Sequence, residues 1–224
     1  MQPKINYQLE LEKELKKIKA EGRRPRLLLH GCCAPCSSYV LEYLSEIFDI
    51  TLFYYNPNIA PREEFERRAA EAARLIREMG VPVALQVARY EPELWREAVR
   101  GLENEPEGGR RCEACFRLRL NKTAQAAKEG GYDYFTTTLS ISPLKDAQLL
   151  CRLGGELSQA SGVPYLYSDF KKKGGYQRSI ELSRIYSLYR QDYCGCAFSR
   201  AERERKKAAE DCDGKQSLVQ NNQI

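Results

Sequence analysis

The chain has 224 residues, a hydrophobic fraction of 42%, a charged fraction of 30% and a net charge of +5. This length suits one α/β unit with an extension, and the modest positive charge permits an anionic partner without arguing for nucleic-acid binding by itself. Residues 1–26 lack the apolar core of a secretory signal, and no later stretch reaches the roughly 18 apolar residues of a membrane span, so we expect a cytoplasmic protein without a membrane partner.

The elements predicted along the chain alternate between helices and strands. A helix within residues 1–25 carries Leu11, Leu15 and Ile18 on one face, and we expect it to pack on the outside of the main unit. A second helix is predicted over 61–80, where apolar residues recur at helical spacing and the arginines are expected to form a solvated face. Apolar runs predict strands at 26–30, 50–55, 81–88, 132–138 and 163–168.

This alternation predicts βαβ units and therefore a parallel sheet with helices on both faces, whose sites form at the carboxyl ends of the strands. The chain after about residue 140 is expected to be mostly helical. We expect residues 26–211 to form one α/β domain and the polar stretch 212–224 to be a disordered tail.

Nine cysteines are the most distinctive feature of the sequence. In a reducing compartment, and in a chain of this length, they are not expected to serve as stabilising disulfides. Seven of them are clustered, while Cys151, expected to be an apolar filler, and Cys212 stand alone. The clustered cysteines are Cys32, Cys33 and Cys36 after the first strand, Cys112 and Cys115 in a CxxC, and Cys194 and Cys196 in a CGC.

Three chemistries are compatible with these clusters. A thioredoxin-like exchanger would use the CAPC that opens a helix after the first strand, but this leaves Cys32, the second CxxC and the CGC without a role. A structural zinc site would combine CxxC pairs, although Cys36 and Cys112 lie 76 positions apart, far more than in a zinc ribbon. An iron-sulfur centre is the third possibility, because clustered thiolates select such centres as well as zinc.

The spacing within the clusters bears on the third possibility. Cys112 and Cys115 would share one helical face and bind adjacent irons, with Cys32 and Cys33 supplying further ligands. The CGC is compatible with a strained, easily reduced disulfide that cycles with a dithiol, and equally with a bidentate grip on a metal. The sequence does not separate these two roles.

Several motifs together resemble the cobalamin-independent epoxyqueuosine reductases, which complete queuosine synthesis in bacterial tRNA. The resemblance spans most of the chain from residue 27 to residue 199, and its strength lies in the order and combination of the motifs. They are "HGCCAPCSSYV", "FYYNPNIAPREEFERR", "RRCEACFRLRLNKTAQAA", "FTTTLSISPLKD", "YSDFKKKGGYQRSIELS" and "LYRQDYCGCAFS".

The resemblance implies a nucleotide-alpha-hydrolase-like fold, that is, a PP-loop or HUP-like, Rossmann-type parallel sheet. It also implies an enzyme that reduces epoxyqueuosine at the wobble position of tRNA with a 4Fe-4S cluster and a redox-active pair. The implied cluster ligands are Cys32, Cys33, Cys112 and Cys115, and the implied redox pair is Cys194 and Cys196. An electron donor of unknown identity would be required, and we expect a monomer.

Other polar residues are weaker candidates for the site. Cys36, Asp146 and Asp169 are candidates for a second site, holding a mononuclear iron, or for proton delivery. Asn56 and Asn58 are candidates to bind hydroxyl groups of the substrate, or simply mark a turn. Lys171, Lys172, Lys173 and Tyr176 suit contacts with a phosphate backbone and a base, or form a solvated loop. His30 is expected to be a satisfied structural residue. The competing functions are a zinc-stabilised RNA-binding protein and a thioredoxin-like thiol exchanger.

Overall fold

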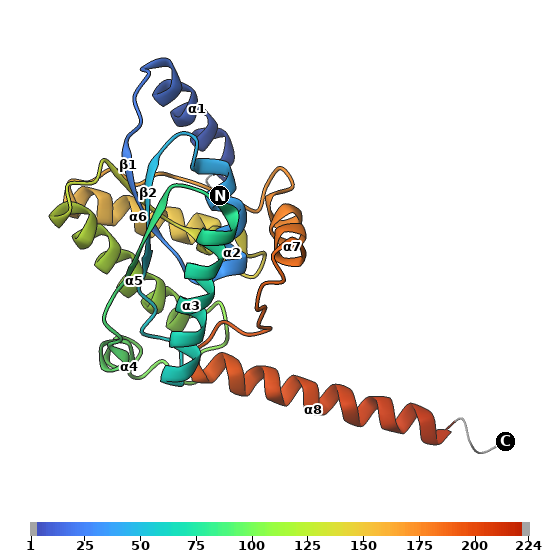
Figure 1. Ribbon diagram of the computed structural model, residues 1–224. Helices are drawn as coiled ribbons and strands as arrows, with labels where there is room; N and C mark the ends of the chain where they lie inside the picture. The colour runs from blue at the N-terminus through green and yellow to red at the C-terminus, as the bar shows by residue number, and fades with distance from the viewer. Residues whose placement is uncertain (1–3, 221–224) are drawn as a thin grey trace.

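The computed structural model describes residues 4–220, with side chains described as far as residue 209. Its centre is a parallel sheet with the strand order β3-β2-β1-β4 (Figure 1). Since this order is the first part of the doubly wound 3-2-1-4 arrangement, the carboxyl ends of β1 and β4 lie at a topological switch point. The strands are β1 (Arg26–His30), β2 (Asp49–Tyr54), β3 (Val83–Val87) and β4 (Tyr134–Thr137).

Helices cover both faces of the sheet, as predicted. Those near one face are α1 (Tyr7–Ala20), α2 (Ala34–Leu44) and α3 (Arg62–Met79), and those on the other are α5 (Arg110–Glu129) and α6 (Ala147–Ser161). The remaining described helices are α4 (Pro92–Ala98), the 3-10 turn η1 (Thr138–Ile141), α7 (Gly175–Ile185) and α8 (Ala197–Gln220). None of the helices in residues 4–220 is long and apolar enough to cross a membrane.

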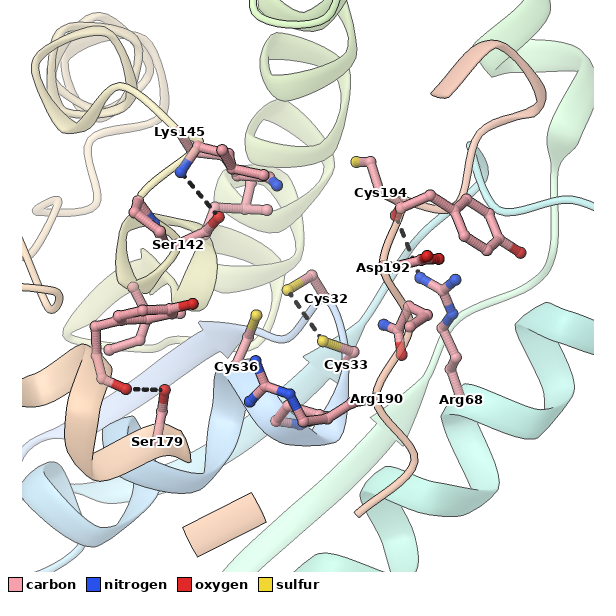
Figure 2. Close-up of a pocket in the computed structure, with 18 of the residues that line it drawn as sticks. Cys32, Cys33, Cys36, Arg68, Ser142, Lys145, Ser179, Arg190, Asp192 and Cys194 are labelled. Carbon is pink, nitrogen blue, oxygen red and sulfur yellow. Dashed lines mark hydrogen bonds between the residues drawn. The ribbon is translucent and has the colours of Figure 1, made fainter. Parts of the chain in front are cut away.

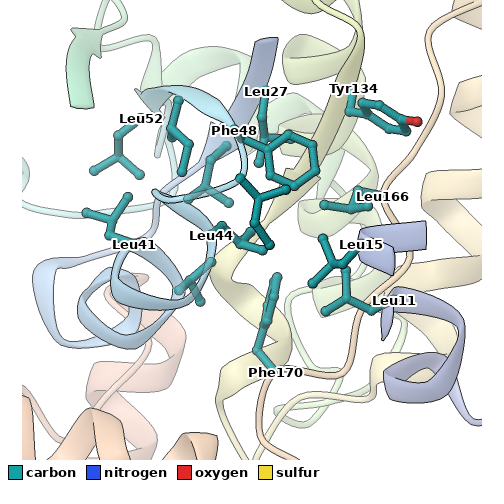
Figure 3. Close-up of a cluster of buried hydrophobic side chains, with 14 of the residues drawn as sticks. Leu11, Leu15, Leu27, Leu41, Leu44, Phe48, Leu52, Tyr134, Leu166 and Phe170 are labelled. Atoms are coloured by element: carbon teal, nitrogen blue, oxygen red, sulfur yellow. The ribbon is translucent and has the colours of Figure 1, made fainter. Parts of the chain in front are cut away.

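The central strand β1 shows why helices cover both faces of the sheet. Leu27 and Leu29 face the cluster that contains Leu41 of α2, which Figure 3 shows, whereas Leu28 faces Leu120 of α5. Strands that are buried on both faces carry continuous apolar runs, and β1 is such a strand. Its register pairs Leu27 with residues of both β2 and β4. The carboxyl end of β1 is thereby fixed in the middle of the sheet.

The predicted strand at 163–168 is wrong in extent. Only Tyr165 forms a bridge there, parallel to Phe135 of β4. The Phe135 N–H donates to Pro164 O and the Leu166 N–H donates to Phe135 O, at 3.0 and 2.9 Å. Pro164 itself has no N–H to extend the ladder. The Thr136 hydroxyl also donates to Leu166 O at 2.8 Å, which holds the segment beside β4.

Both ends of the chain bear on the predictions. Leu11, Leu15 and Ile18 of α1 are buried in the cluster that covers one face of the sheet, as expected. At the other end, α8 continues to Gln220 and so occupies much of the stretch 212–224 for which we expected disorder. Ion pairs at helical spacing, such as Arg200 to Glu204, stabilise the first part of this helix. Residues 221–224 of that tail lie outside the described residues.

Candidate functional site

Three thiols meet directly after β1. The chain leaves the strand at His30, and Cys33 immediately precedes α2, whose first turn holds Pro35 and Cys36. The Sγ atoms of Cys32, Cys33 and Cys36, which we call the thiol triad, lie within 4.8 Å of one another. Figure 2 shows them together at the floor of a cavity. The topology therefore places the triad at the switch point where ligand sites are expected.

The three thiols of the triad differ in acidity. Hydrogen bonds from the other two thiols, helped by Arg119 and Lys145, hold the pKa of Cys32 well below its usual value. The same interaction with Cys32 raises the pKa of Cys33 to about 12, and interactions with Cys32 and Cys33 raise that of Cys36. Removal of the remaining protons would require a cation. Binding of a metal ion provides such a cation and releases protons from its thiol ligands.

A cavity of about 370 Å³, which we call the main cavity, opens above the triad. It contains more basic than acidic side chains, so it favours a negatively charged or polar occupant. The polar and sulfur-containing residues that line it include Cys32, Cys33, Cys36, Arg68, Glu107, Arg119, Lys145, Tyr176, Ser179, Arg190, Gln191, Asp192, Tyr193 and Cys194.

The far wall of the main cavity is the segment 186–196, which we call the strap. Polar contacts attach it to α3. Glu71 accepts a hydrogen bond from the Tyr189 N–H at 2.7 Å, and Arg74 donates to Tyr186 O at 3.0 Å. The Tyr189 hydroxyl lies 3.2 Å from both carboxylate oxygens of Glu64, and the guanidinium of Arg67 lies 3.5 Å from the centre of the Tyr189 ring.

The strap ends in the CGC pair. Arg68 Nη1 donates to Cys194 O at 3.2 Å, which fixes the backbone of this cysteine beside α3 (Figure 2). Gly195 has φ of +116°, and a Cβ there would lie 2.9 Å from both Arg68 Nη1 and a carbon of Ile59. Only glycine accommodates this conformation and this close approach without strain. Cys194 and Cys196 are both free thiols.

A second, smaller cavity adjoins the first and contains the CxxC. Cys112 and Cys115, in the first two turns of α5, line it together with Cys194 and Cys196. Burial raises the pKa of both α5 thiols, and Cys112 accepts a hydrogen bond from the Gly108 N–H at 3.2 Å. Because Cys194 lines both cavities, the fold gathers all seven clustered cysteines into one region.

A buried polar network supports the triad from below. Arg119, on α5, donates to His30 Nε2 at 3.3 Å and to Asn56 Oδ1 at 2.5 Å. The Asn56 amide also donates to Gly31 O at 2.9 Å. Burial and the charge of Arg119 lower the pKa of His30 to about 3, so the ring is neutral. Its Nδ1 lies 2.8 Å from Thr137 Oγ1, so His30 is a satisfied structural residue, as expected.

The other predicted site residues lie in different places. Tyr176 lines the main cavity and Asn58 lines the smaller one, whereas Asn56 uses both ends of its amide within the protein. Asp146 caps α6 by accepting from the Gln148 N–H at 2.8 Å. Asp169 pairs with Lys171 and Lys172, and Lys173 pairs with Glu12. These charged residues do not line either of the two cavities.

Sequence reasoning missed several residues of the site. Arg68 was expected on a solvated face of its helix but is only 2% exposed, because the strap covers it and Glu64 pairs with it at 2.6 Å. Lys145 lies in the quoted "SPLKD" motif, and Arg190 and Asp192 lie just before the CGC, which was the available signal. Their position in the cavity depends on how the strap crosses α3, and local sequence patterns do not show this.

Comparison with known proteins identifies the family. A family model described as epoxyqueuosine reductase QueH matches residues 27–202. The epoxyqueuosine reductase QueH of Staphylococcus epidermidis is 46% identical over 202 residues, which cover 88% of this chain and 85% of that protein. That of Thermotoga maritima is 36% identical over 183 residues, which cover 81% and 94%.

Among solved structures, the U34-tRNA thiolase NcsA from Methanococcus maripaludis with its [4Fe-4S] cluster aligns with a TM-score of 0.49 at 14% identity, covering 84% of this chain and 68% of that one. The family assignment rests on the sequence matches, which extend over both the triad and the CGC. They confirm the resemblance seen in the motifs. The chain belongs to the epoxyqueuosine reductase QueH family.

Proposed function

We propose that this protein reduces epoxyqueuosine to queuosine at the wobble position of tRNA, without cobalamin, at the main cavity. The observation that carries the proposal is that the thiol triad and Cys194 of the CGC line the same cavity. In the reaction both C–O bonds of the epoxide break, a C=C bond forms and the oxygen leaves as water. The substrate must therefore receive two electrons and two protons.

The CGC pair can supply both the two electrons and the two protons. Oxidation of the Cys194 and Cys196 thiols to a disulfide releases two electrons and two protons, which balances the reduction of one epoxide. Both thiols are free, so the pair is in the state that this step requires. An external electron donor would then reduce the disulfide for the next turnover. Burial raises the pKa of the Cys196 thiol to about 12, so its proton is retained until the reaction.

The cysteines also suit an iron-sulfur centre. The donor set is all sulfur, and thiolates are the ligands of 4Fe-4S clusters. We propose Cys32, Cys33, Cys112 and Cys115 as the cluster ligands, with Cys36 as a ligand of a second, mononuclear iron. When bound, these groups supply single electrons and a Lewis acid for the epoxide oxygen. The gathering of these cysteines around two adjoining cavities supports this assignment.

Two cations of the protein are placed to act on the oxygen. Lys145 lines the main cavity, and no carboxylate in residues 4–209 pairs with it. Burial lowers the pKa of Lys145, but its interactions with Cys194, Cys32 and Cys36 outweigh burial and raise it, so the ammonium group stays charged. It would stabilise the oxygen as negative charge develops and would provide a hydrogen-bond donor. Arg68, on the opposite wall, has a second buried nitrogen, Nη2, without a partner.

The rim of the main cavity suits a nucleic acid. Leu144 is 74% exposed beside the cavity, and Tyr176 and Tyr193 provide rings on which bases can stack. Arg190 provides a cation for a phosphate group. Lys171, Lys172 and Lys173 remain candidates for backbone contacts, although phosphates would have to replace their present partners, Asp169 and Glu12. We propose that the protein acts as a monomer in the cytoplasm.

The test is to purify the full chain anaerobically, measure iron, sulfide and zinc, and assay it with tRNA that carries epoxyqueuosine and a chemical reductant. Queuosine is detected by mass spectrometry of the digested tRNA. We expect iron and sulfide in the protein and one queuosine formed per two electrons consumed. The variant Cys194→Ser should keep its iron and sulfide but lose turnover. Zinc without sulfide, or disulfide reduction without metal, would contradict the proposal in favour of the binding protein or the thiol exchanger.

A further inference from the structure

Arg119 is a buried cation whose hydrogen-bond acceptors are neutral. Its side chain is 1% exposed, and its hydrogen-bond acceptors are the neutral ring of His30 and the amide of Asn56. Within the described part of the chain, no carboxylate forms an ion pair with it. Burial of a guanidinium without a counter-charge is costly, by several kcal/mol in general. A negative charge must therefore come from another source.

The other groups near Arg119 are thiols. Burial lowers the pKa of Arg119, but its interactions with Cys115, Cys194 and Cys32 outweigh burial and raise it. These three cysteines come from α5, from the strap and from the loop after β1. Arg119 thus lies at the point shared by all three cysteine clusters. Its Nη1 is buried and has no hydrogen-bond partner in the structure, so one donor remains available on this side chain.

Two neighbouring arginines are placed differently from Arg119. Arg68 is also buried, but Glu64 neutralises it at 2.6 Å. Arg111 is buried beside the smaller cavity, where its Nη1 donates to the carbonyl oxygens of Glu103 and Glu105 and its Nε has no partner. Arg119 is the one of these three that lines the main cavity with the triad and has no carboxylate partner in the described part of the chain.

We propose that Arg119 is a positioning residue that raises the reduction potential of the iron-sulfur centre, with Nη1 donating a hydrogen bond to one of its sulfur atoms. The proposal rests on the proposed function, because it requires that the cysteines hold such a centre. Each electron that enters a cluster makes it more negative by one charge. A fixed buried cation and a hydrogen bond to sulfur therefore favour the reduced form.

The hydrogen-bond network around Arg119 connects its guanidinium group to the loop that carries the triad. His30 Nε2 lies 3.3 Å from Arg119 Nε and 3.2 Å from Tyr55 O, and His30 Nδ1 lies 2.8 Å from Thr137 Oγ1, so both sides of the ring are held. Asn56 bridges the guanidinium to Gly31 O, one residue before Cys32. The positions of the cation and of the first thiol are thereby coupled. Asn56 therefore has a structural role below the triad, and its contact with substrate hydroxyl groups stays a prediction.

The experiment measures the midpoint potential of the anaerobically purified or reconstituted full chain by a redox titration followed by electron paramagnetic resonance. Two variants lower the positive charge in different ways. Arg119→Gln removes the cation, and Asn56→Asp leaves it in place but adds a carboxylate 2.5 Å from Nη2. For each variant we expect iron and sulfide contents equal to those of wild type. We also expect the one-electron equilibrium to shift at least tenfold toward the oxidised form, which corresponds to a midpoint potential lower by about 59 mV or more.

Arg117→Gln is the matched control, because Arg117 lies on the same helix but pairs with Glu156 at the surface. Its potential should equal that of wild type, and Arg119→Lys, which keeps the charge, should fall between wild type and Arg119→Gln. If both Arg119→Gln and Asn56→Asp have normal iron and sulfide contents and an unchanged midpoint potential, the inference about Arg119 is wrong while the proposed function stands. If Arg119→Gln does not fold, Asn56→Asp decides. Wild-type protein without iron or sulfide would overturn the proposed function and the inference together.

Discussion

The loop after β1 and the strap deliver cysteines to the same cavity by different means. The loop is short and continues a central strand directly into α2, so the backbone of the sheet sets the positions of Cys32 and Cys33. The strap has no regular secondary structure before α8. Side chains of α3, among them Arg68 and Arg74, hold it, together with the buried Leu188 and one backbone hydrogen bond from the Ala60 N–H to Gly195 O. Backbone attachment is rigid, whereas side-chain attachments can be exchanged at low cost.

This difference matches the two proposed tasks. Ligands of a metal centre must keep a fixed geometry, which a strand end and a helix start provide. A dithiol that is oxidised and reduced in each turnover must instead meet both the substrate and an external donor. The strap, held mainly by side-chain contacts outside the sheet, suits the second task. Two results would contradict this distinction. One is activity that does not need the cysteines of the loop, and the other is a strap that is as rigid as the sheet.

The largest effect is expected from the loop. Cys33→Ala removes a thiol that lies 3.8 Å from Cys32 and is buried, so no other side chain can take its place. We expect loss of the cluster iron and sulfide, and a fall in activity greater than the roughly 10- to 100-fold that loss of an outer-shell partner of a metal ligand causes. Metal analysis and the queuosine assay measure both quantities.

Cys151→Ala is the control for this change. Cys151 is buried in the core away from the site, where its Sγ lies 3.5 Å from Ser168 O, and its loss should leave metal content and activity near those of wild type. Cys36→Ala separates the two proposed metal sites, because this variant should keep the four irons of the cluster and lose only the additional iron. Retention of full iron and sulfide in Cys33→Ala would show that the triad is not the centre.

A smaller effect is expected when the strap is loosened. Arg68→Lys keeps the charge, but a single ammonium group cannot replace the two contacts to Glu64 and Cys194 O. Loss of a buried hydrogen bond costs about 1–3 kcal/mol, and we expect a fall of about tenfold in activity with unchanged iron content. Hydrogen exchange should become faster in 186–196 and stay slow in 32–44. Equal protection of both segments would contradict the distinction between loop and strap.

The smallest effect is expected from Tyr189→Phe. This change removes the hydroxyl contacts with Glu64 but keeps the ring that stacks on Arg67. We expect a loss of about 0.5–1 kcal/mol in the free energy of unfolding and an activity within about twofold of wild type, checked by chemical denaturation and the same assay. A loss as large as that in Arg68→Lys would mean that Tyr189, more than Arg68, holds the strap in place.

Much of the fold follows from local patterns. The apolar run at 26–30 becomes β1 with the predicted bounds, and the helix predicted over 61–80 is observed as Arg62–Met79. Alternation of strands and helices correctly predicts a parallel sheet with two covered faces. Residues just after β1 were placed at a site because the carboxyl ends of parallel strands meet at one edge. These predictions succeed because periodicity and strand order are local properties.

By itself, the sequence determined the sheet, the cysteine clusters and the family. Only the tertiary structure decided that Arg68 is buried under the strap, that Arg119 lies among three clusters, and that Cys194 lines two cavities. The contact between Arg68 and Cys194 joins residues 126 positions apart through a segment without regular structure. The path of such a segment depends on side-chain contacts with a distant helix, which no local pattern in the sequence encodes.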